Sequence, residues 1–147
     1  MKRFSYRFEG LQNVRGIELD NLRMDMRSIE HQLELAQLQL HEMQAELETS
    51  YEEIARLRAS RGGTVMLESL NGYTALLRHR LQEQNGLIAR RQHELEQARL
   101  RVSEKHRETK VLEKHREQQF GIYLQDMERD MQREMDESAG NMGNQLD

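Results

Sequence analysis

Two heptad repeats on either side of a glycine doublet constrain the fold most strongly. Mostly apolar residues recur at steps that alternate four and three, from Leu22 to Leu57 and again from Leu67 to Val102. This spacing is typical of a helix that buries one stripe against a second helix in a coiled coil. The first repeat comprises Leu22, Met26, Ile29, Leu33, Ala36, Leu40, Met43, Leu47, Ser50, Ile54 and Leu57. The second comprises Leu67, Leu70, Thr74, Leu77, Leu81, Gln84, Ile88, Arg91, Leu95, Ala98 and Val102.

Gly62-Gly63 lies between the repeats and predicts a turn. Glycine is favoured just past a helix C-terminus, where a left-handed conformation is needed, and Thr64 is a suitable cap for the next helix. Asn71-Gly72 is a second turn signal, so the turn could be wider. We therefore predict an all-α fold in which two long helices form an antiparallel coiled-coil hairpin. Residues 1–139 would form one domain, with a first arm over about 5–60, a turn at 60–64, a second arm over about 65–139 and a flexible tail at 140–147.

The position of the turn fixes which residues face each other. A turn centred on Gly62 pairs residues whose numbers sum to about 124, such as Ser50 with Thr74 or Phe4 with Phe120. All seven aromatic residues then fall into two layers, one part-way along the hairpin and one at its open end. The alternative, a parallel dimer of continuous helices, would place several glycines inside a helix, where each costs about 1 kcal/mol relative to alanine.

Composition and motifs point away from several classes of protein. The 147 residues include no Cys, no Pro and no Trp, and the formal net charge is −4. No apolar run approaches the 18 or more residues of a membrane span, and the first residues lack the apolar stretch of a secretory signal. We expect a soluble protein of a reducing compartment, without a transmembrane segment.

The chain also lacks the motifs of common catalytic and binding sites. It has no phosphate-binding glycine loop and no HExxH, and no two of its six histidines are spaced to chelate a metal from one helix face. The basic stretch Arg78–Arg116 contains acidic residues throughout and no aromatic residue, which is typical of a solvated helix face. We therefore expect no enzymatic activity, no cofactor, no metal and no nucleic-acid partner.

A methionine stripe follows the second repeat. Leu124, Met127, Met131 and Met135 share one helix face beyond the point where the first arm has ended. An unpaired methionine-rich face is suited either to docking of another protein or to self-association. Residues 120–147 also carry two basic and seven acidic residues, so this face lies on an acidic segment.

Three segments resemble the FliJ family of flagellar export proteins. The opening Phe4–Arg15 is similar to the family's aromatic–Arg–aromatic start. Val111–Phe120 resembles its Leu-Glu-Lys-x-Arg-Glu-x-x-Phe segment, and Met135–Ala139 resembles its Met-Asp-Glu ending. The resemblance covers almost the whole chain in the correct order.

The resemblance implies a cytoplasmic, non-enzymatic stalk at the inner-membrane face of the type III export apparatus. Such a stalk would be a monomeric rod that promotes assembly of the hexameric export ATPase, contacts the cytoplasmic domain of the export-gate membrane protein and binds chaperones of late substrates. ATPase contacts would then fall on Phe4, Tyr6, Phe8, Leu11, Leu124, Met127 and Met131. Gate contacts would fall on Leu47, Tyr51, Tyr73 and Leu77, although Leu47 and Leu77 are also predicted core residues. The alternatives are the equivalent stalk of a virulence secretion system and a self-associating structural coiled coil.

Overall fold

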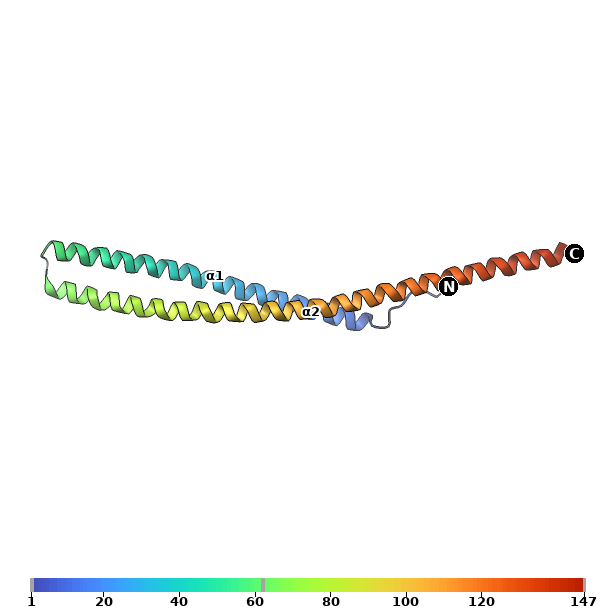
Figure 1. Ribbon diagram of the computed structural model, residues 1–147, viewed down its shortest axis with the longest axis horizontal. Coiled ribbons are helices and arrows are strands. Elements are labelled where there is room, and N and C mark those ends of the chain that lie inside the picture. Colours follow the sequence, from blue (N-terminus) through green and yellow to red (C-terminus); the bar gives the residue numbers. More distant parts are fainter. Residues whose placement is uncertain (1, 62, 147) are drawn as a thin grey trace. The chain divides into compact units, whose positions relative to one another are not determined.

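Two long helices account for nearly all of the chain. The computed structural model describes residues 2–61 and 63–146, with α1 at Glu9–Ala59 and α2 at Thr64–Leu146. Residues 22–59 of α1 and 64–101 of α2 lie side by side and run in opposite directions (Figure 1). The predicted all-α antiparallel hairpin is confirmed, and the alternative of one continuous helix per chain is wrong because α1 ends at Ala59.

The internal contacts divide the chain into two units. The turn unit is residues 22–101, and the terminal unit combines the N-terminal residues up to 21 with those from 102 onward. In the turn unit, every predicted repeat position from Leu22 to Leu57 and from Leu67 to Ala98 is buried or half-buried. The most deeply buried of these are Ala36, Ser50, Ile54, Thr74, Leu77, Gln84, Ile88, Leu95 and Ala98. The heptad pattern therefore identifies the core.

Polar side chains at repeat positions report the register of the turn unit. Ser50 Oγ lies 2.5 Å from Thr74 Oγ1, and these two numbers sum to the predicted 124. Because the Thr74 hydroxyl donates to the Leu70 carbonyl at 2.8 Å, the Ser50 hydroxyl is the donor between the two. Gln84 Nε2 donates across the interface to the Ala36 carbonyl at 2.9 Å. The buried polar groups are thus satisfied, which avoids the cost of an unpaired donor or acceptor.

The turn differs from its prediction in detail. Gly62, the predicted centre, lies outside the described residues. Among the described residues, Arg61 adopts the left-handed conformation, with φ 53°, instead of a glycine. The Gly63 carbonyl accepts the Leu67 backbone N–H at 3.3 Å, so Gly63 rather than Thr64 is the residue that precedes and caps α2. Asn71 and Gly72 lie within α2, and the turn is no wider than predicted.

The first arm begins later than predicted in the terminal unit. Residues 5–8 are not helical, and α1 starts at Glu9. The Tyr6 carbonyl accepts the Glu9 N–H at 3.2 Å, and the Phe8 carbonyl accepts the Gln12 N–H at 2.8 Å. Residues 2–8, which we call the N-terminal strap, carry aromatic side chains at positions 4, 6 and 8. That period of two fits an extended segment better than a helix.

The second helix ends later than predicted. It continues through residues 140–146, which are exposed, instead of stopping near Ala139. Because no proline interrupts this segment, its two glycines cost only about 1 kcal/mol each relative to alanine and need not end the helix. Residue 147 lies outside the described residues.

Candidate interaction surfaces

The N-terminal strap lies on α2 through an aromatic cluster in the terminal unit. The ring of Phe4 lies 5.1 Å from that of Phe120 and 5.4 Å from that of Tyr123. The Tyr123 hydroxyl donates to the Lys2 carbonyl at 2.7 Å. The strap thereby covers α2 beyond the start of α1, and Phe4 faces Phe120 as the sequence predicts.

Tyr6 anchors the strap. Its side chain is only 4% exposed, and its hydroxyl lies 2.7 Å from Nδ1 of His115 and 3.4 Å from the Leu112 carbonyl. The guanidinium of Arg116 lies 5.7 Å from the centre of its ring, a cation–π arrangement. Phe8 packs beside Tyr6 at 6.0 Å between rings but remains 37% exposed. Of the predicted ATPase-contact residues on this side, Tyr6 is therefore an internal anchor, whereas Phe8 and Leu11 are accessible.

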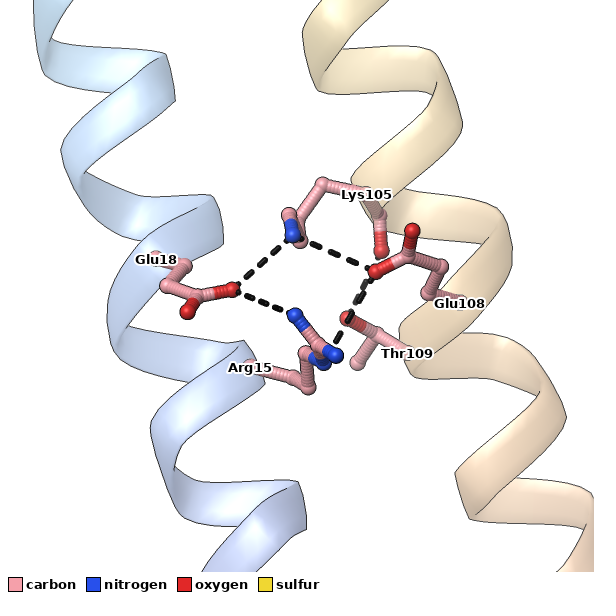
Figure 2. Close-up of polar contacts among 5 residues, drawn as sticks. All are labelled: Arg15, Glu18, Lys105, Glu108 and Thr109. Atoms are coloured by element: carbon pink, nitrogen blue, oxygen red, sulfur yellow. Dashed lines mark hydrogen bonds and ion pairs between the residues drawn. The ribbon is translucent and has the colours of Figure 1, made fainter.

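A charged layer occupies the helix interface of the terminal unit (Figure 2). Lys105 Nζ lies 2.9 Å from a carboxylate oxygen of Glu18 and 3.2 Å from one of Glu108. Arg15 contacts the same two glutamates. Its Nη1 lies 3.0 Å from Oε2 of Glu18, and its Nε lies 3.8 Å from Oε2 of Glu108. Thr109 donates its hydroxyl to the Lys105 carbonyl at 2.9 Å. Each of the four charged side chains thus contacts two side chains of opposite charge.

This layer was not predicted from the sequence. The first repeat continues upstream of Leu22, through the buried Leu19 to the half-buried Arg15 and Gln12. The apolar part of the repeat ends at Leu19, because the two preceding repeat positions, Arg15 and Gln12, are polar. The heptad spacing, if extended without regard to polarity, predicts that Arg15 and Gln12 lie at the interface.

The charged layer shifts two pKa values in opposite directions. Hydrogen bonds from Lys105 and Arg15 lower the pKa of the Glu18 carboxyl below its ordinary value of 4.5. Hydrogen bonds to Glu18 and Glu108 raise the pKa of the Lys105 ammonium above its ordinary value of 10.5. Both shifts favour the charged forms found in the layer, so the layer adds to the stability of the fold while both groups are charged.

These shifts predict a pH window for the layer. The contribution of Glu18 to the stability of the fold is present above pH 4.5 and is lost as the pH falls through the lowered pKa of its carboxyl. The Lys105 contribution is present below pH 10.5 and is lost as the pH rises through the raised pKa. We therefore expect the destabilisation caused by Glu18→Gln to be largest near neutral pH and to vanish in acid. Urea unfolding of wild type and variant across the pH range measures it.

Glu117→Gln is the matched control for this prediction, because Glu117 is an exposed glutamate of the same unit. Its effect should be small at every pH, as for most surface charges. A Glu18→Gln penalty that stays constant down to strongly acidic pH would contradict the prediction.

The methionine stripe is an accessible apolar face of α2 beyond the strap. Leu124 is 45% exposed and Met131 48%, whereas Met127 is half-buried. A groove runs along this face, lined by Lys2, Tyr123, Asp126, Met127, Asp130, Met131 and Glu134. The strap reaches its near end through Lys2. The groove thus brings Lys2 of the strap next to Met127 and Met131 of α2.

The predicted gate-contact residues lie together in the turn unit but differ in exposure. Tyr51 is 46% exposed and Tyr73 45%, each next to a member of the buried Ser50–Thr74 pair. Leu47 is half-buried, and Leu77 is only 1% exposed. Leu77 therefore packs inside the unit, and the two tyrosines are the residues that a partner can reach.

Among the described residues, no group of three or more His, Cys, Asp or Glu side chains is arranged to hold a metal ion. The features that stand out are exposed aromatic, methionine and charged side chains along helices. Contiguous exposed apolar patches are common at the interfaces between macromolecules.

A comparison with protein families decides the identity of the chain. The family model described as "Flagellar FliJ protein" matches residues 4–145. The chain belongs to the FliJ family. Searches of curated proteins and of solved structures return no match.

Membership of the FliJ family confirms the resemblance seen in the sequence. FliJ proteins are structural components of the cytoplasmic flagellar type III export apparatus. In the described part of this FliJ chain, no helix combines the length and apolar character needed to cross a membrane.

Proposed function

We propose that this chain is a non-enzymatic stalk of the flagellar type III export apparatus. It promotes ring assembly by the export ATPase and couples that ring to the export gate and to chaperones of late substrates. The observation that carries the proposal is the family match over residues 4–145 of a chain that folds into an antiparallel helical hairpin. Its place would be peripheral, at the cytoplasmic face of the inner membrane, where the export apparatus holds it.

The terminal unit supplies the proposed ATPase surface. The strap residues Phe4 and Phe8, with Leu11, present aromatic and aliphatic groups from the N-terminal side, and Tyr6 fixes them to α2. Leu124, Met127 and Met131 extend this surface along α2. An apolar surface of this kind, rimmed by charges, is what a protein–protein contact requires.

Adding the purified protein to the cognate export ATPase tests this proposal. We expect faster ATP turnover and more ring formation, whereas the protein alone should not hydrolyse ATP. Light scattering should show a monomer at micromolar concentration. Absence of any effect on turnover and ring formation, together with no binding to the gate domain, would refute the stalk function. A dimer or filament would favour the self-associating alternative.

Tyr51 and Tyr73 are the proposed gate contacts. Each presents a half-exposed aromatic ring, and Leu47 and Leu77 hold the helices beneath them. Exposed tyrosines are common binding hot spots, whose truncation to alanine costs about 2 kcal/mol or more, or roughly thirtyfold in affinity. We therefore expect Tyr51→Ala combined with Tyr73→Ala to weaken binding of the export-gate cytoplasmic domain by at least about thirtyfold, as measured by calorimetry.

Leu38→Ala is the control for the gate prediction, since Leu38 is 57% exposed on the same unit but away from the two tyrosines in sequence. The double variant should retain its helical content and its effect on the ATPase. If the double variant binds the gate domain as tightly as wild type, the gate-binding surface lies at other residues.

A further inference from the structure

An acidic edge runs along the methionine stripe. Asp126, Asp130 and Glu134 recur every four residues, so they line one side of α2 for two turns. All three line the groove that also contains Met127 and Met131. In the described part of the chain, none of the three carboxylates makes a hydrogen bond or an ion pair with another residue. This surface therefore combines unpaired negative charge with adaptable apolar side chains.

The strap shows what kind of segment fits this helix face. It lies on the preceding turns of α2, where it places the aromatic ring of Phe4 against Phe120 and Tyr123. It also brings Lys2 to the near end of the groove. An apolar side chain flanked by a basic one thus already covers part of this face. The groove continues the same face beyond the end of the strap.

We propose that this acidic groove docks a basic amphipathic helix of a partner protein. The apolar face of that helix would contact Met127 and Met131, and its Lys or Arg side chains would pair with Asp126, Asp130 and Glu134. Helices dock in this way through apolar residues three and four positions apart. Complementary rim charges would speed association and make it sensitive to salt. The inference rests on the proposed function, because it names the chemistry of the segment that this end of the stalk binds.

A model peptide tests the chemistry directly. The probe is a fluorescent 18-residue helix built only of leucine and lysine at helical spacing, titrated against the full-length protein by fluorescence anisotropy. The control peptide carries glutamate in place of each lysine. We expect the lysine peptide to bind, the glutamate peptide to fail, and binding to weaken steeply as salt increases.

Two matched protein variants locate the site. Asp126→Asn, Asp130→Asn and Glu134→Gln together should weaken the lysine peptide about tenfold. Glu117→Gln, Glu128→Gln and Asp136→Asn remove the same charge at residues of α2 that do not line the groove. That control triple should leave binding within about threefold of wild type. Met127→Ser with Met131→Ser should weaken binding without changing its salt dependence. Equal effects of the two charge triples would overturn the inference.

The cognate ATPase separates this inference from the stalk function. We call the variant with Asp126→Asn, Asp130→Asn and Glu134→Gln the groove triple. If the wild-type protein stimulates the ATPase, the groove triple stimulates it less and high salt reproduces that loss, both the stalk function and the groove inference are supported. If the groove triple is as active as wild type and binds the peptide as well, the groove inference fails while the stalk function stands. Failure of the wild-type protein to stimulate would instead count against the stalk function. A wild-type dimer that the groove triple abolishes would assign the groove to a second copy and overturn the inference.

Discussion

Leu77→Ala is expected to lower the free energy of unfolding by about 2–4 kcal/mol. Leu77 is 1% exposed and belongs to the repeat that forms the interface of the turn unit. A two-helix interface has few fully buried side chains, so little surrounding structure can close over the lost methyl groups. Urea unfolding followed by far-UV circular dichroism measures the change.

The neighbouring residue supplies the control for that experiment. Leu76 is 44% exposed, so Leu76→Ala removes the same atoms from the outer face of the same helical turn. Its effect should stay within about 0.5 kcal/mol, as for most surface substitutions. Similar losses for both variants would show that the repeat does not form the core.

Tyr6→Ala is expected to release the N-terminal strap from α2. The substitution removes a ring that is 4% exposed, its contact with Arg116 and its hydrogen bonds to His115 and Leu112. Loss of a buried aromatic side chain costs about 3 kcal/mol, and the short strap has no helical hydrogen bonds of its own to compensate. Limited digestion with trypsin should therefore cleave after Arg3 and Arg7 roughly a hundredfold faster than in wild type.

Tyr6→Phe separates packing from hydrogen bonding in this prediction. It keeps the ring and removes only the hydroxyl that contacts His115 and the Leu112 carbonyl. The expected loss is about 1 kcal/mol, which corresponds to less than a tenfold increase in cleavage. Cleavage of Tyr6→Ala at the wild-type rate would show that Tyr6 does not anchor the strap.

The candidate surfaces differ in how far the sequence predicts them. Ser50 opposite Thr74 follows from the position of the turn, because an antiparallel helix pair has one register once its turn is fixed. Phe4 contacts Phe120 as predicted, although the strap that carries Phe4 is not helical. The exposure of Tyr51 and the burial of Leu77 follow from their positions beside and on the repeat. The strap and the charged layer do not follow from the heptad repeat. Both depend on polar or irregular residues, for which a search for apolar helical periodicity gives no signal.

The sequence by itself determined that the chain is all-helical, that it turns back near residues 60–64 and which residues form the interface of the turn unit. Heptad spacing carries that information because burial of one helix face dominates the energetics of a coiled coil. Only the tertiary structure decided that residues 2–8 leave the helix to pack Tyr6 on α2, and that Arg15 and Lys105 share an interface with Glu18 and Glu108. These arrangements depend on pairing between residues about a hundred positions apart, where side-chain geometry, not local periodicity, sets the free energy.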